Sequence, residues 1–89
     1  MVKVHNLESP RTGKPVANQF VITTDKGIYF QSYETLIAAK EKGVLTLDIN
    51  ALDYSRTTSK YLYQFTMMNR KELEAGIKEG IIKTRDLNR

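Results

Sequence analysis

The residues best suited to chemistry gather between positions 54 and 71, where cations, hydroxyls and aromatic rings occur with no acidic residue among them. The cations of this window are Arg56, Lys60, Arg70 and Lys71, and together they equal the net charge of +4, so the rest of the chain is balanced. A local cationic excess favours phosphate-bearing or acidic partners, although the same charges also suit an ordinary solvated surface.

The first part of this window, Ser55 to Lys60, holds two cations and four hydroxyls. If a helix begins here, its unpaired backbone N–H groups and its dipole favour a phosphate or carboxylate. Aromatic rings nearby would stack on nucleic-acid bases or anchor a protein interface. The predicted binding residues are Tyr54, Arg56, Thr57, Lys60, Tyr61, Tyr63, Arg70 and Lys71. The alternative is structural, in which Thr57 or Thr58 caps the helix, aromatic rings fill the core and the cations are solvated.

Outside this window the sequence offers no catalytic constellation. The single histidine, His5, has no partner nearby that would make it a general base. The chain has no cysteine, which excludes thiolate zinc sites and disulfides, and the pair Asp48 and Asp53 is too ordinary to indicate magnesium. The glycine-rich phosphate-binding loops and the GxSxG motif are also absent. We therefore expect a protein that is not an enzyme and uses no metal or cofactor.

Length and composition are those of one small domain that spans residues 1–89. Charged residues make up 27% and hydrophobic residues 40% of the chain, which suits a folded domain rather than a disordered one. No apolar run approaches the roughly 20 residues that a membrane-spanning helix needs. The first ten residues lack the apolar core of a secretory signal. We therefore expect a cytoplasmic protein without membrane contact.

The most regular stretch lies between residues 19 and 43 and begins with a predicted hairpin. Apolar and polar residues alternate over Gln19–Thr23 and again over Ile28–Gln31, which is typical of strands with one buried face. The loop Asp25–Gly27 between them ends in glycine, which would supply the positive φ of a bulged turn. The two strands should therefore be antiparallel neighbours.

A helix is predicted directly after this hairpin. The spacing of Tyr33, Leu36 and Ile37 places the three side chains on one helical face. Ser32 fits the N-cap position, and Gly43 fits the residue that follows a helix and often takes a left-handed conformation. The short connection to the next strand requires this helix to fold back on the sheet.

Further strands are predicted at Met1–Leu7, Val44–Ile49 and Ile81–Leu87. The loop Glu8–Pro15 is rich in turn-forming residues and carries a second pair of candidate binding cations, Arg11 and Lys14. A helix is predicted over Arg70–Glu79, with Asn69 as N-cap and Glu72 at capping-box spacing. Gly76 is expected to weaken this helix and Gly80 to end it.

The segment Tyr54–Met68 fits two patterns. As a helix, it would place Tyr61, Phe65 and Met68 on one face, whereas as a strand it would align Tyr61, Tyr63 and Phe65. Hydroxyl residues at its start favour the helix and its aromatic density favours the strand. We favour the helix.

The predicted element order is β-β-β-α-β-α-α-β, which indicates an α+β domain. Its small sheet should be mainly antiparallel, with helices packed on one face. The strand order cannot be derived from these patterns. Exposed edge strands make a homodimer plausible, because pairing two edges satisfies their free backbone groups.

Three segments of the chain, SPRTGKPVANQFVITTDKGIYFQSYETLIA, LD and DYSRTTSKYLYQF, resemble a family of small uncharacterised proteins from phages, prophages and plasmids of low-GC Gram-positive bacteria. The resemblance runs from about Ser9 to Phe65 and implies no activity and no functional residue. It implies a setting, that of an accessory protein of a mobile element in a bacterial cytoplasm. Small proteins of this setting often bind a host factor or handle nucleic acid. We therefore expect a binding protein whose partner is a host or defence protein, with nucleic acid as the alternative.

Overall fold

The computed structural model describes residues 1–89 and contains one six-stranded sheet and two α-helices. The strands are β1 (Lys3–Glu8), β2 (Pro15–Thr23), β3 (Ile28–Ser32), β4 (Thr35–Glu41), β5 (Val44–Asp48) and β6 (Lys83–Arg85). A short 3-10 helix, η1 (Ala51–Asp53), precedes the helices α1 (Arg56–Thr66) and α2 (Arg70–Lys78). The predicted α+β class is confirmed.

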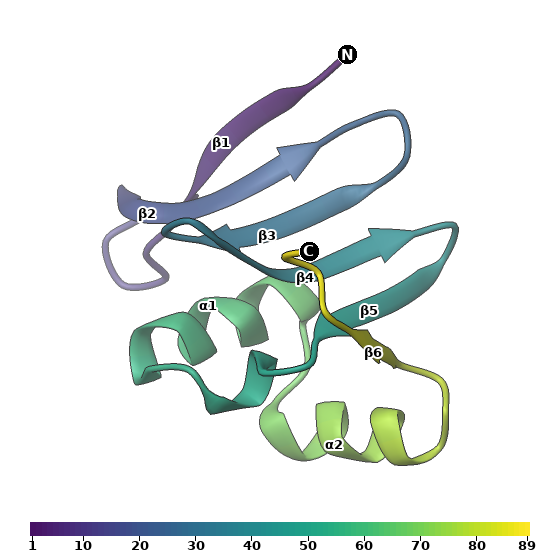
Figure 1. The fold of residues 1–89 in the computed structure, drawn as a ribbon. Coiled ribbons are helices and arrows are strands. Elements are labelled where there is room, and N and C mark those ends of the chain that lie inside the picture. The colour runs from purple at the N-terminus through teal and green to yellow at the C-terminus, as the bar shows by residue number, and fades with distance from the viewer.

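The sheet has the strand order β1-β2-β3-β4-β5-β6, the same as the order along the chain (Figure 1). The first five strands form an antiparallel meander, in which each pair is joined by a turn or short loop. The last strand, β6, runs parallel to β5 because the segment that carries α1 and α2 crosses over between them.

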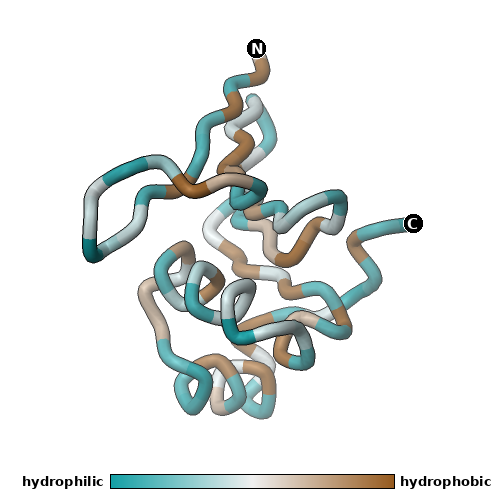
Figure 2. The backbone as a smooth tube through the Cα atoms, turned by 90° about the vertical axis from the view of Figure 1, so that its left-hand side faces the viewer, coloured by the Kyte–Doolittle hydropathy of each residue, from teal (hydrophilic) through white to brown (hydrophobic).

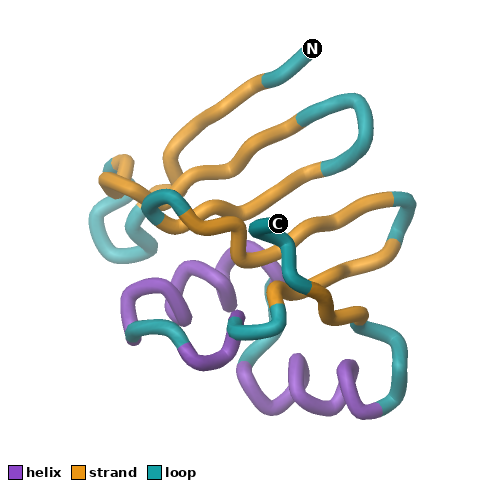
Figure 3. Tube along the Cα trace, viewed as in Figure 1, coloured by secondary structure: helices purple, strands orange, loops and turns teal.

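Both helices cover the same face of the sheet (Figure 3). Residues that face them form a row across four neighbouring strands, in the register Val21, Phe30, Ala38 and Leu47. All four are buried and belong to one core cluster with Leu62 and Phe65 of α1 and Leu73 of α2. Figure 2 shows hydrophobic stretches where the sheet and the helices meet, and others near the N-terminus away from the helices.

Three contacts fix α1 against the sheet. The Phe65 ring stacks on Phe30 with ring centroids 5.8 Å apart. The Lys40 Nζ donates a 2.7 Å hydrogen bond to the carbonyl oxygen of Phe65, and it also lies 4.5 Å from the centre of that ring. At the start of the helix the hydroxyls of Ser32 and Thr58 lie 3.0 Å apart. The rotation of α1 about its axis is therefore set, and so is the face that it turns to solvent.

The predicted helix after Ser32 is wrong, because residues 35–41 form the central strand β4. This strand is buried on both faces, with Ala38 opposite Leu47 toward the helices and Ala39 opposite Thr46 on the other side. A bulge opposite Phe30 and Gln31 inserts Ile37, which breaks the period of two. The resulting apolar run has the spacing of a helix. It forms a strand because it is buried between two neighbouring strands.

The other two helices are confirmed, with a different N-cap for α1 and with α2 ending at Lys78, one residue earlier than predicted. Ser55, rather than Thr57 or Thr58, caps α1 by accepting a hydrogen bond from the Thr58 backbone N–H. The capping box of Asn69 and Glu72 is present at α2. The predicted role of Gly27 is also wrong, because its φ is not positive. A side chain there would instead meet the Lys40 carbonyl oxygen, 2.3 Å from the Cβ position.

Gly76 in α2 is a packing requirement, which corrects its predicted role as a weak point. A Cβ at this position would lie 2.4 Å from Cδ1 and 2.7 Å from Cγ1 of the buried Ile82. Alanine normally stabilises a helix interior relative to glycine by about 1 kcal/mol. Here Gly76→Ala is expected to lower the free energy of unfolding by about 1–3 kcal/mol, as overpacked cores do. Urea denaturation of the variant measures this change.

A second background tests the cause of that loss. Ile82→Ala removes the atoms that the new Cβ would meet, so Gly76→Ala should stabilise the protein when it is added to Ile82→Ala. A loss of stability in both backgrounds would contradict the steric explanation.

Candidate functional site

The outer face of α1 carries a shallow hollow of about 600 Å³. Positions 56, 59, 60 and 63 recur three or four residues apart and so lie along one side of the helix. Tyr54 before α1 and Arg70 at the start of α2 complete the wall. The lining residues, called the α1 hollow from here on, are Tyr54, Arg56, Ser59, Lys60, Tyr63 and Arg70. Five of them are among the eight binding residues that the sequence predicts.

The α1 hollow is cationic, because none of its lining residues is acidic. Arg56 and Lys60 are exposed and take part in none of the ion pairs of the structure. Arg70 is held in place, since its Nη1 donates a 2.8 Å hydrogen bond to the Leu52 carbonyl and its Nε lies 3.5 Å from a carboxylate oxygen of Glu74. Arg56 and Lys60, the two free cations in the sense that they form no ion pair, therefore carry charge that no carboxylate offsets, and the Lys60 Nζ lies 5.5 Å from the centre of the Tyr61 ring.

The remaining predicted residues lie elsewhere. Tyr61 is buried in the core with 4% of its surface exposed, as the structural alternative expects. Thr57 and Lys71 are exposed but do not line the hollow, and Arg11 and Lys14 lie on the exposed loop between β1 and β2. Tyr61 and Tyr63 are two residues apart, which places them on different sides of a helix.

Helical spacing applied to the same window would also have found Ser59, the one lining residue that the prediction missed. Two of the four hydroxyls at the start of α1, those of Ser55 and Thr58, are engaged within the protein. Ser55 caps the helix, and the buried Thr58 contacts both Ser55 and Ser32. The α1 hollow is therefore lined by side-chain cations and rings rather than by free groups of the helix terminus.

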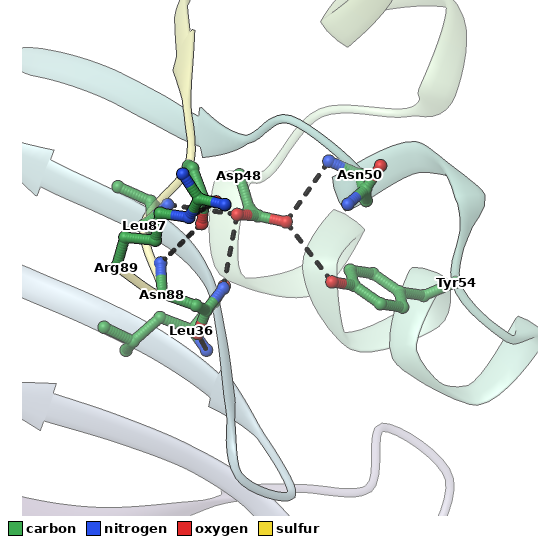
Figure 4. Close-up of polar contacts among 8 residues, drawn as sticks. Leu36, Asp48, Asn50, Tyr54, Leu87, Asn88 and Arg89 are labelled. Carbon is green, nitrogen blue, oxygen red and sulfur yellow. Dashed lines mark hydrogen bonds and ion pairs between the residues drawn. The ribbon is translucent and has the colours of Figure 1, made fainter.

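Tyr54 is positioned by the buried carboxylate of Asp48 (Figure 4). The Tyr54 hydroxyl donates a 3.2 Å hydrogen bond to Asp48 Oδ2, which also accepts one of 3.2 Å from the Asn50 N–H. The other oxygen of Asp48 accepts hydrogen bonds from the Leu87 N–H at 3.1 Å and from the Asn88 side chain at 3.2 Å. The C-terminal tail thus helps to hold one wall of the hollow.

The amino-acid sequence matches one known protein family. A model of a family of unknown function, DUF8033, matches residues 2–83. The chain belongs to DUF8033. A search of the curated proteins and a search of the solved structures each found no match. All six residues that line the α1 hollow fall within the part that matches the DUF8033 model.

The DUF8033 chain brings together no group of three or more histidine, aspartate or glutamate residues that could hold a metal ion. His5 is exposed on the edge strand β1, and Asp48 is engaged by the four hydrogen bonds described above. Neither helix is long and apolar enough to cross a membrane.

The environment of Tyr54 predicts that its phenol loses its proton at a higher pH than a free tyrosine. Burial, the Asp48 charge and the hydrogen bond to Asp48 together raise the pKa of Tyr54 above its ordinary value of 10.0. Because the folded pKa exceeds the unfolded one, this contribution to stability is complete below pH 10 and is lost as the pH rises through the folded pKa. Absorbance of the phenolate in an alkaline titration of the folded protein measures the effect.

Tyr29 is the second phenol with a raised pKa, chiefly through its hydrogen bond to Glu41. We therefore expect Tyr54→Phe to remove part of the late absorbance change and Tyr29→Phe to remove another part. An unchanged late component in Tyr54→Phe would contradict the assignment.

Proposed function

We propose that this DUF8033 protein is a non-enzymatic accessory protein of a phage or mobile element. It acts in the bacterial cytoplasm by covering the surface of a host or defence protein. The observation that carries the proposal is the α1 hollow, in which Arg56 and Lys60 present free charge beside the rings of Tyr54 and Tyr63.

The composition of the hollow supports a protein partner. Tyrosine and arginine are, together with tryptophan, the residues most enriched at the energetic centre of protein interfaces. The rings offer apolar contact area with few rotatable bonds, and the guanidinium of Arg56 can pair with a carboxylate through two hydrogen bonds. The hollow would therefore fit an acidic segment that also carries an apolar side chain.

The contacts that hold the lining residues of the hollow in place support the same proposal. Tyr54 is held by Asp48, Arg70 is held by Leu52 and Glu74, and α1 is fixed on the sheet by Phe65. A surface that is already ordered loses little conformational entropy when a partner binds. The free cations would steer an acidic partner toward it.

Nucleic acid is the second candidate, and one specific observation favours it. The two rings and the two free cations line the same hollow, an arrangement that single-stranded nucleic acid binders use for bases and phosphates. In this case affinity would fall steeply with salt, since each neutralised phosphate releases counterions.

The deciding experiment uses the tagged full chain as bait in lysate of a Gram-positive host, with and without nuclease. Our proposal expects a protein retained in near-equal amount to the bait in both conditions, and a direct complex when that protein is purified. Capture that nuclease abolishes, together with salt-sensitive binding of labelled single strands, would support the second candidate. If neither lysate nor oligonucleotides yield a complex, both candidates are wrong.

A further inference from the structure

A second cationic surface lies away from the α1 hollow and shares no residue with it. It has a volume of about 790 Å³ and is built from the β2–β3 turn, the β4–β5 hairpin and β6. In Figure 1 these turns lie at the right of the molecule, whereas the start of α1 lies at the left. The residues of this surface, the lysine trough, are Asp25, Lys26, Glu41, Lys42, Val44, Thr46, Lys83, Thr84 and Arg85.

Both acidic residues of the lysine trough already have partners. An oxygen of Asp25 lies 3.3 Å from the N-terminal amine of Met1. One oxygen of Glu41 lies 3.8 Å from Arg85, and the other accepts a 2.5 Å hydrogen bond from the Tyr29 hydroxyl. The four cations of the trough, three lysines and Arg85, outnumber its two carboxylates, so the trough as a whole is cationic.

Lys26, Lys42 and Lys83 are all exposed, and none of them forms an ion pair. They come from three segments far apart in the sequence and are brought together only by the fold. Because like charges repel when they converge on one surface, this arrangement favours a polyanionic ligand that would neutralise them.

The backbone of Lys42 supplies an independent observation. Lys42 and Gly43 form the two-residue turn between β4 and β5, with φ of 52° and 76°. A turn with positive φ at both positions favours asparagine, aspartate or glycine at the first of them. A lysine at this position is strained, and such strain often marks a residue kept for function.

We propose that the lysine trough binds the phosphate backbone of duplex nucleic acid without reading its sequence. Only one hydrophobic residue, Val44, lines the trough, and no aromatic ring does. Protein interfaces anchor through aromatic and apolar side chains, and single-strand binders stack bases on rings. Contacts to duplex phosphates need neither, because cations and hydroxyls suffice. The inference is independent of the function proposed for the α1 hollow.

The test measures binding of a labelled 20-base-pair duplex by the full chain at several low salt concentrations, with DNA and RNA duplexes of one sequence as separate arms. The test variant is Lys26→Ala/Lys42→Ala/Lys83→Ala. The control, Lys3→Ala/Lys78→Ala/Arg89→Ala, removes the same charge from exposed positions outside the trough. We expect the test variant to bind at least about tenfold more weakly and to lose about 2.7 from the salt slope, at 0.9 per phosphate contact.

The single variant Lys42→Asn separates function from structure. It should raise the melting temperature, because asparagine suits the turn, and it should weaken duplex binding at the same time. Of the three lysines only Lys83 lies on an edge strand, β6, where a lysine also discourages pairing between sheets. If that were its role, removing Lys83 would leave duplex binding unchanged. The proposal is overturned by absent duplex binding at low salt or by equal losses in test and control variants. Tighter binding of poly-glutamate than of either duplex would assign the trough to an acidic protein instead.

Discussion

Replacing Asp48 with alanine is expected to lower the free energy of unfolding by about 3–4 kcal/mol. The residue Asp48 is 4% exposed, and its carboxylate accepts four hydrogen bonds, from Asn50, Tyr54, Leu87 and Asn88. Alanine would leave these donors without their acceptor in a site from which water is largely excluded. Because small domains have only about 5–15 kcal/mol of stability, the loss would be a large fraction of the total.

The position of Asp48 makes the effect larger than that of an ordinary carboxylate. It stands at the end of β5 and joins three segments: the strand, the turn before α1 and the C-terminal tail (Figure 4). The tail also reaches β4, where the Asn88 side chain exchanges two hydrogen bonds with the backbone of Leu36, at 2.7 and 3.0 Å. Losing the carboxylate would therefore loosen the tail and one wall of the α1 hollow together.

Two variants control this result. Asp48→Asn keeps the shape and one acceptor oxygen, so it should cost less than Asp48→Ala. Asp86→Ala removes an exposed carboxylate of the same tail, and we expect a change below about 1 kcal/mol from it. Urea denaturation compares the three proteins. Equal losses in Asp48→Ala and Asp86→Ala would contradict the central role of Asp48.

Local sequence signals predicted those elements that local interactions determine. The hairpin of β2 and β3 alternates with period two, and α2 carries its complete capping box at Asn69. The prediction failed at β4, because apolar and polar residues do not alternate in its run from Leu36 to Ala39. Both sides of that strand are covered, and its bulge adds a residue, so only the neighbouring strands distinguish it from a helix.

The two candidate sites also differ in how far local sequence determines them. Most of the α1 hollow was predictable because its residues are close in sequence and one helix sets their spacing. Arg70 joins them only because its side chain reaches back to Leu52. The lysine trough was not predictable, since Lys26, Lys42 and Lys83 become neighbours only through strand order, which the sequence patterns leave open.

Reversing the two free charges of the α1 hollow should abolish capture of the proposed partner. For Arg56→Glu/Lys60→Glu we expect a loss of affinity of about 100-fold or more, because residues at the centre of an interface each contribute tenfold or greater effects. Reversal also turns attraction of an acidic partner into repulsion, which slows association. The measurement is the affinity of the purified complex, with partner capture from lysate as a first readout.

The fold itself should tolerate this change, which separates a binding defect from unfolding. Both residues are exposed and form no ion pair, and Arg56 opens α1, where the helix dipole favours a negative charge. The melting temperature should therefore stay the same or rise. The matched control, Lys14→Glu/Lys71→Glu, changes the net charge equally at exposed positions outside the hollow. The two double variants change the net charge equally and differ only in whether the changed residues line the α1 hollow. If the control loses affinity as strongly, the overall charge of the protein rather than the α1 hollow attracts the partner.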